Sequence, residues 1–263
     1  SIAQLFHAGM RADERYSNEK VGASDNVEKG TRELSLIEIN DLKDAFVSSS
    51  LRAQECNYDG VEFHAAHGYL ISQFLSSKYN KRTDRYGGSL ENRSRLLFEI
   101  IEATQRSTDS KFLIGVRLSP ERFGLEIEEM IVLYTLLCEE TNIDFIDLSL
   151  WDSFKLLDSG KHAGRSLLKL FTDINRQGKK LTVAGKIFSF EDIEILAKNQ
   201  VDFFCLGRAA ILDHQFPRRL RELGSNFQSF SAPVSRCHLA SEGLSEKFID
   251  YMATWKNFVE PIE

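Results

Sequence analysis

Two histidines and a tyrosine stand close together in the segment His64-Ala-Ala-His67-Gly-Tyr69. The apolar stretch before them is typical of a β-strand, so the three side chains follow its carboxyl end. In α/β proteins with parallel sheets, this end of the strands carries the active site. A single histidine there is most often an ordinary hydrogen-bonded residue. Three hydrogen-bonding groups at one strand end instead favour a site for an organic substrate.

A metal site is the alternative for the same histidines, because imidazole ligates zinc and iron. Metal sites usually need a third protein ligand, and the sequence around His64 and His67 contains no obvious candidate. The four cysteines are far apart and form no Cys-x-x-Cys pair: they are Cys56, Cys138, Cys205 and Cys237. We therefore expect no bound metal, and we expect reduced thiols in a cytoplasmic protein.

The composition excludes several other classes. The 33 basic and 39 acidic residues give a net charge of −6. A net negative charge does not favour binding to nucleic acid or to an anionic membrane. The longest nearly apolar run, residues 130–138, is too short to span a bilayer, and no signal-peptide pattern opens the chain. The first residue is Ser rather than Met, which indicates a missing or processed N-terminus.

Short apolar runs alternate with segments of helical period, a pattern that predicts repeated βα units and a parallel sheet. We expect strands over residues 2–7, 60–64, 112–118, 145–150, 181–184 and 203–206. We expect helices over residues 35–56, 90–106, 126–140, 167–176 and 190–198, and Ser35 with Glu38 fits a capping box. The long connections 8–33 and 65–89 and a helical or irregular tail over 218–263 complete the chain.

Two architectures fit six such strands. A (β/α)₈ barrel has eight parallel strands, so a barrel that starts at residue 2 would lack its first two βα units. An open, doubly wound sheet needs no such absence. The pattern alone leaves both open.

Several segments together resemble the Old Yellow Enzyme family of flavin-dependent NAD(P)H oxidoreductases. The resemblance lies in His64-Ala-Ala-His67-Gly-Tyr69 followed by the charged segment 80–93, which by itself would be a solvated loop. It extends to residues 4–9, 115–119, 185–187 and 206–208, and so covers nearly the whole chain. It implies a TIM-type (β/α)₈ barrel of α/β class, a single FMN-binding domain over 1–263, and reduction of activated C=C bonds.

The resemblance also assigns roles to residues. Gln4 would hydrogen-bond the pyrimidine edge of the flavin, and Arg117 would lie near its N1 and O2 atoms, where a cation stabilises the charge of the reduced ring. The alternative for Arg117 is a simple ion pair at a strand end. Backbone amides would hold the FMN phosphate in two turns, formed by Gly185 with Lys186 and by Gly207 with Arg208.

The substrate side follows the same resemblance. His64 and His67 would donate hydrogen bonds to the carbonyl or nitro oxygen of the substrate, and Tyr69 would protonate its α-carbon. NADH or NADPH would reduce FMN first and leave before the alkene enters. Met10 follows Gly9 where the family usually has arginine, so the role of Arg11 stays open.

Three hypotheses result. The first is the small-molecule ene-reductase just described. The second is a truncated, non-catalytic barrel, motivated by the two missing units. Open apolar strand edges would then favour a covering partner or a homo-oligomer. The third is a metal-dependent lyase of the same fold that uses His64 and His67.

Overall fold

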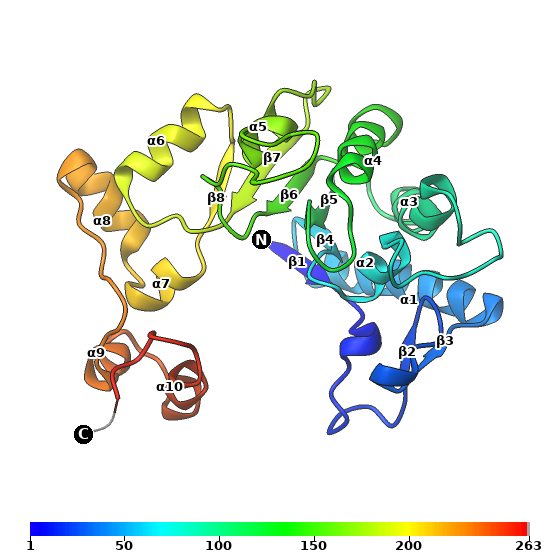
Figure 1. Cartoon of the computed structure of the whole chain (residues 1–263), viewed down its shortest axis with the longest axis horizontal. Helices are drawn as coiled ribbons and strands as arrows, with labels where there is room; N and C mark the ends of the chain where they lie inside the picture. Colours follow the sequence, from blue (N-terminus) through cyan, green and yellow to red (C-terminus); the bar gives the residue numbers. More distant parts are fainter. Residues whose placement is uncertain (262–263) are drawn as a thin grey trace.

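The computed structural model describes residues 1–261, and its centre is a sheet of six parallel strands (Figure 1). The strands follow one another in the order β1-β4-β5-β6-β7-β8. Their bounds are Ile2–Leu5, Gly60–Ala65, Leu113–Leu118, Phe145–Ser149, Lys180–Ala184 and Phe203–Cys205. All six predicted strands are confirmed, close to their expected bounds.

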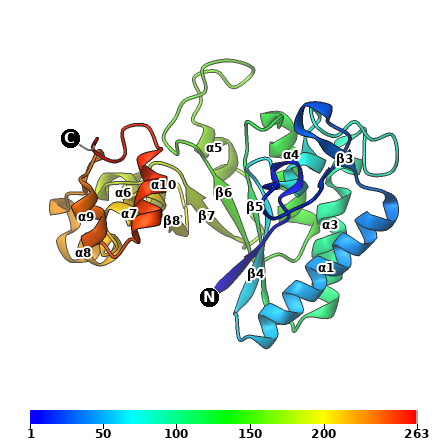
Figure 2. The ribbon, with the colours of Figure 1, turned by 90° about the horizontal axis from the view of Figure 1, so that it is seen from below.

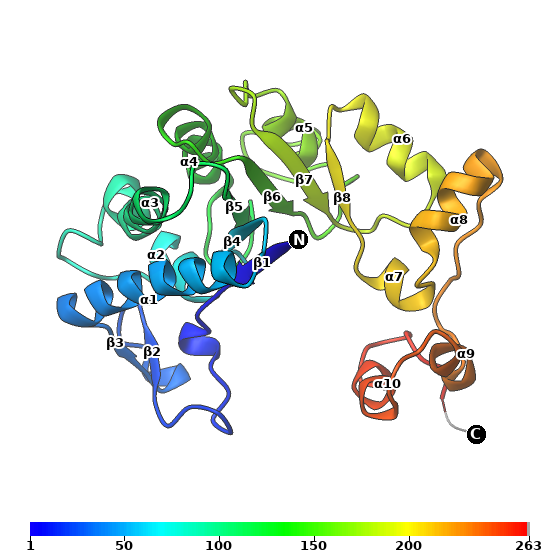
Figure 3. The ribbon, with the colours of Figure 1, turned by 180° about the vertical axis from the view of Figure 1, so that it is seen from behind.

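The strand order identifies the architecture. It rises without reversal along the chain, whereas a doubly wound sheet reverses its order at a switch point. The sheet curves into an arc with helices on its outer side (Figures 1 and 3). This is part of a (β/α)₈ barrel with six of the eight strands. Within residues 1–261, the first and last strands of the order, β1 and β8, each pair with one strand of this sheet.

Four of the five outer helices named here start at a serine whose side chain caps the first turn. Ser35 and Glu38 form the predicted capping box of α1 (Leu36–Glu55), and Ser189 with Asp192 forms another at α6 (Phe190–Lys198). Three more helices cover the same side: α3 (Leu90–Ser107), α4 (Ile127–Glu140) and α5 (Leu167–Thr172). The predicted helix over 167–176 was too long, because α5 ends at Thr172 with Asp173 as its C-cap. The chain then turns through Gln177 and Gly178, both with positive φ.

Smaller elements fill the connections that we expected to be loops. The first connection contains the 3₁₀ helices η1 (Gly9–Arg11) and η2 (Val27–Lys29) and the paired strands β2 (Lys20–Gly22) and β3 (Thr31–Glu33); the second contains α2 (Leu70–Leu75). After β8 come the helices α7 (Arg208–Leu212), α8 (Phe216–Leu223), α9 (Arg236–Ser241) and α10 (Glu246–Ala253), with η3 (Gly224–Asn226) between α8 and α9. Figure 2 shows these last helices beside β8, at the opposite end of the arc from α1 and α3.

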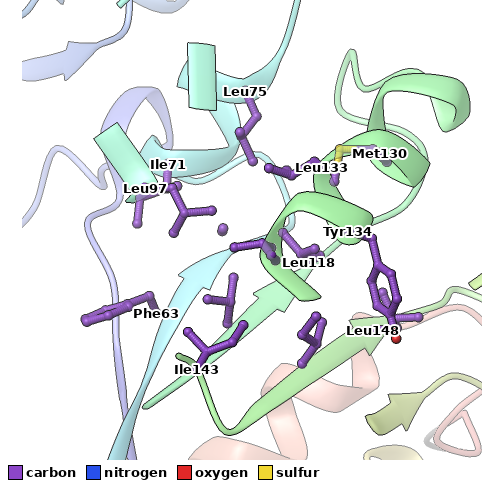
Figure 4. Close-up of a cluster of buried hydrophobic side chains, with 14 of the residues drawn as sticks. Phe63, Ile71, Leu75, Leu97, Leu118, Met130, Leu133, Tyr134, Ile143 and Leu148 are labelled. Atoms are coloured by element: carbon purple, nitrogen blue, oxygen red, sulfur yellow. The ribbon is translucent and has the colours of Figure 1, made fainter. Parts of the chain in front are cut away.

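Alternation along the strands separates the core from the inner face of the arc. Phe63 of β4 and Leu118 of β5 point outward and pack with α2, α3 and α4 (Figure 4). Their strand neighbours Glu62, His64 and Arg117 point to the inner face, because successive side chains of a strand point to opposite sides. The inner face therefore carries polar groups that the outer core excludes. Among residues 1–261, no helix is both long and apolar enough to cross a bilayer.

Candidate active site

His64, His67 and Tyr69 lie together at the carboxyl end of β4, as predicted. His64 is 4% exposed, and its Nε2 atom lies 3.2 Å from Nδ1 of His67. His67 follows the strand with a φ of 59°, a left-handed conformation that histidine adopts more readily than most residues. Its backbone N–H donates to Oγ of Ser119 (3.0 Å), which fixes the turn. Tyr69 precedes α2, and its ring centroid lies 5.1 Å from that of His64.

Both imidazoles are electrically neutral near pH 7. Burial lowers the pKa of His64 to about 3, with further contributions from His67 and from the Arg117 cation. Burial also lowers the pKa of His67 to about 4, again with help from Arg117 and from Arg11. Each neutral ring has one N–H donor and one acceptor nitrogen. The pair can therefore share one hydrogen bond and still offer a donor to a ligand.

Arg117 of β5 projects from the inner face, one strand from the histidines. Its Nε donates to Oγ of Ser149 (2.7 Å) and lies 3.2 Å from Oδ2 of Asp147, both on β6. Asp147 is buried, and burial raises the pKa of its carboxyl while Arg117 opposes that shift. The two β6 residues thus fix the guanidinium in the arc.

Gln4 lies on the inner face of β1, opposite Glu62 in the strand register. Its amide donates to the Glu62 carboxyl. Burial and the nearby Asp147 raise the pKa of Glu62 to about 7, although the bond from Gln4 and the charge of Arg117 lower it. Gln4 itself is exposed, because β1 is the first strand of the arc.

A cavity of about 350 Å³ brings six of the nine predicted residues together, whereas Gln4, His64 and Tyr69 are not in its lining. Its lining includes His67, Arg117, Gly185, Lys186, Gly207 and Arg208. His64 is linked to it through the hydrogen bond with His67. The two glycine turns follow β7 and β8, so they face the histidines across the carboxyl end of the sheet.

The two turns fit an anionic group such as the FMN phosphate. Gly185 has a φ of 149°, and a Cβ there would lie 2.1 Å from the carbonyl oxygen of Leu150. At Gly207 a Cβ would meet nothing within 4 Å, so the backbone faces open space. The amides of Lys186 and Gly207 donate to no other backbone group in the described part of the chain. They remain available to an anion, and the close approach of backbone to phosphate favours glycine.

The side chains in these turns are engaged elsewhere. Lys186 pairs with Asp152 (2.8 Å), and the Arg208 guanidinium lies 5.4 Å from the centroid of the Trp255 ring. Any contact of Lys186 and Arg208 with an anion would therefore come first from their backbone N–H groups.

Sequence reasoning missed part of this site. Glu62, Ser119, Phe123, Asp147 and Ser149 were not selected, yet each contacts a predicted residue or lines the cavity. The sequence did contain a signal for Glu62, Asp147 and Ser149. Polar residues alternate with apolar ones in these strands, and alternate side chains of a strand point to the same face. The loop with Ser119 and Phe123 carries no such pattern.

A metal centre at the histidines would need further ligands. Across residues 1–261, no three His, Cys, Asp or Glu side chains gather in an arrangement that could hold a metal ion. The lyase hypothesis therefore lacks a third ligand near His64 and His67.

Fold and site together define a partial (β/α)₈ barrel with polar side chains and two glycine turns at the carboxyl ends of its strands. The family model described as the NADH:flavin oxidoreductase / NADH oxidase family matches residues 2–225. The chain belongs to this family. Membership confirms the predicted resemblance, and it supports FMN as the cofactor of the site.

Two curated relatives support this family membership. The chain is 31% identical over 236 residues to a probable NADH-dependent flavin oxidoreductase, YqiG, of Bacillus subtilis, which covers 84% of this chain and 63% of that protein. It is 32% identical over 227 residues to an NADPH dehydrogenase of Bacillus pumilus, covering 83% of this chain and 65% of that one. The chain thus spans just under two thirds of the length of these relatives.

Solved structures show the same fold. Morphinone reductase in complex with tetrahydroNAD superposes with a TM-score of 0.71 at 25% identity, over 90% of this chain and 68% of that one. An old yellow enzyme homologue from Zymomonas mobilis gives a TM-score of 0.69 at 27% identity, over 84% of this chain and 66% of that one.

Proposed function

We propose that the chain acts as an ene-reductase, which uses NADH or NADPH to reduce the C=C bond of α,β-unsaturated carbonyl or nitro compounds. The proposal is carried by the imidazole pair: His67 lines one cavity with Arg117 and the two glycine turns. His64 adjoins both His67 and Tyr69. This arrangement provides hydrogen-bond donors for an oxygen and an acid for a carbon on the same side of the site.

The cofactor site is formed by Gln4, Arg117 and the turns at Gly185–Lys186 and Gly207–Arg208. FMN, when bound, supplies the hydride for the β-carbon of the alkene. Arg117, held by Ser149 and Asp147, stabilises the negative charge that accompanies reduction of the ring. The free amides of the two turns receive the phosphate.

The histidine pair activates the substrate. A donor of His64 or His67 bonds to the carbonyl or nitro oxygen, where negative charge builds as the β-carbon accepts hydride. Because both rings are neutral, this donor is present over the whole physiological pH range. Tyr69 donates its phenolic proton to the α-carbon, which completes net addition of two hydrogens.

A direct test uses the 263-residue chain with FMN. We expect flavin absorbance that anaerobic NADH or NADPH bleaches and that cyclohexenone then restores, with cyclohexanone as product. A chain that binds no FMN would contradict the proposal, as would a bleached enzyme that oxygen restores but cyclohexenone does not.

The non-catalytic barrel remains a second candidate because of Gln4. Its side chain is exposed and pairs with Glu62, so β1 leaves this part of the flavin site open to solvent. The same assay separates the two candidates, since turnover of cyclohexenone would exclude the second.

A further inference from the structure

Two side chains stand at the edge of the sheet between the histidines and the glycine turns. Arg122 lies in the connection from β5 to α4, and Trp151 lies in the connection from β6 to α5. Both line the cavity of about 350 Å³ that His67 also lines, which we call the catalytic cavity. Because β5 and β6 separate β4 from β7 and β8, a molecule that extends from His67 toward the turns passes Arg122 and Trp151.

The guanidinium of Arg122 contacts an aromatic ring rather than a carboxylate. It lies 4.4 Å from the centroid of the Trp151 ring, a cation–π contact. Within residues 1–261, Arg122 forms no ion pair, whereas its neighbour Glu121 does. A guanidinium that faces a ring keeps its N–H groups at its own edge, so Arg122 can still donate hydrogen bonds to a ligand.

The carboxylates of the same two connections already have cationic partners. Glu121 accepts two hydrogen bonds from Lys155, at 2.7 and 2.9 Å, and Asp152 pairs with Lys186 (2.8 Å). The charge of Arg122 is therefore not balanced at this part of the cavity, although the chain as a whole carries a net charge of −6. A cation without a counter-charge in a cavity wall attracts anionic ligands.

The backbone holds Arg122 in a defined turn. Arg122, Phe123 and Gly124 have positive φ values of 69°, 52° and 72°. The N–H of Leu125 donates to the carbonyl oxygen of Arg122 (2.8 Å), and Oγ of Ser76 donates to that of Gly124 (2.7 Å). Left-handed conformations are uncommon for side chains as large as arginine and phenylalanine, and they occur often where a side chain must be placed at a site.

We propose that Arg122 binds a carboxylate of the substrate, so that the chain prefers unsaturated oxo acids to neutral enones. The proposal rests on the proposed function, in which the histidine pair binds the carbonyl oxygen. The ring centroids of His67 and Phe123 are 6.2 Å apart, and Arg122 precedes Phe123, so a short oxo acid can reach both groups. With 4-oxopent-2-enoate, hydride from NADH or NADPH would add to C2, which is β to the ketone, and a proton to C3, giving 4-oxopentanoate.

The experiment uses calorimetry to measure binding of 4-oxopentanoate and of its neutral methyl ester to the FMN-loaded chain and its variants. We expect the parent to bind the acid about fivefold more tightly than the ester, as for a partly exposed charge pair. Arg122→Gln should abolish this preference, and high salt should reduce it in the parent. Arg165→Gln is the matched control, because Arg165 is an exposed arginine of the β6–α5 connection outside the lining of the catalytic cavity.

Equal affinities of the parent for acid and ester would overturn the proposal, as would a preference for the acid that survives in Arg122→Gln. NAD⁺ is the third ligand, because its phosphates are also anions. A loss of NAD⁺ affinity in Arg122→Gln equal to the loss for the acid would assign the cation to the dinucleotide and overturn the proposal too. Failure of the ene-reductase proposal is distinct, because cyclohexenone has no carboxylate and tests turnover without this contact.

Discussion

The Nδ1 atom of His67 lies 3.2 Å from the Nε2 atom of His64, so the two imidazoles share one hydrogen bond inside the site. Two positive rings at this distance would repel one another, and burial already disfavours either charge. The geometry therefore favours two neutral rings, and the proposed function of the pair as a hydrogen-bond donor should not depend on pH above about 5.

The first prediction concerns titration of this pair. In ¹H–¹³C spectra of the histidine Cε1 groups, we expect the His64 and His67 signals to stay unchanged between pH 5 and 8. Their pKa values, about 3 and 4, lie below the unfolded value of 6.5, so the unfolded chain takes up protons first as pH falls. The stability they contribute is complete above pH 6.5 and is lost progressively below it. Signals that shift near pH 6.5 would refute the neutral pair; His64→Gln and His67→Gln assign them.

The second prediction concerns Tyr69. Tyr69→Phe keeps the ring beside His64 and Phe6 but removes the phenolic proton. We expect reoxidation of the reduced enzyme by cyclohexenone to slow by about 10²-fold or more, the usual range for loss of a general acid. Stopped-flow measurements should find reduction by NAD(P)H unchanged, because that step needs no proton from Tyr69. Slowing of both steps would indicate a structural role instead.

The third prediction compares the two glycine turns. Gly185→Ala places a Cβ against the Leu150 carbonyl and forces the turn to move, so we expect FMN affinity to fall at least tenfold. Gly207→Ala is the comparison, because a Cβ there meets nothing within 4 Å and so adds a methyl group without a clash. Its φ of −99° and ψ of −94° lie outside the regions that alanine prefers, so we expect a smaller loss of affinity than for Gly185→Ala. Fluorescence titration with FMN gives both affinities. If the two variants bind FMN equally, the conformation of Gly185 has no part in binding.

The fourth prediction uses Glu62. Its pKa of about 7 exceeds the ordinary value of 4.5, so the folded chain keeps a proton that the unfolded chain releases. Stability from this residue is present below pH 4.5 and is lost as pH rises through 7. Glu62→Gln removes the ionisation. Relative to the parent, its free energy of unfolding should rise by about 2 kcal/mol between pH 5 and 8, at about 1.4 kcal/mol per pKa unit.

Urea unfolding of both proteins at the two pH values measures this difference. The comparison cancels the contribution of the histidines, which is the same in parent and variant. A constant difference between pH 5 and 8 would show that Glu62 titrates normally.

Much of the fold was predictable because its signals are local. Apolar runs such as residues 112–118 and helix starts such as Ser35-x-x-Glu38 depend on neighbours in the chain. Short elements such as β2, β3 and α2 were missed, since three to six residues carry too little periodicity. The residues of the site were found through the family motif, but Asp147 and Ser149 were not, because their importance depends on lying beside Arg117 on another strand.

The sequence by itself determined the alternation of strands and helices and the chemical types at the strand ends. Only the tertiary structure decided between a barrel and a doubly wound sheet, because strand order is a property of pairing between distant segments. It also decided the neutral state of His64 and His67 and the high pKa of Glu62. These depend on burial and on charges brought together from residues far apart in the chain, and no local pattern contains that information.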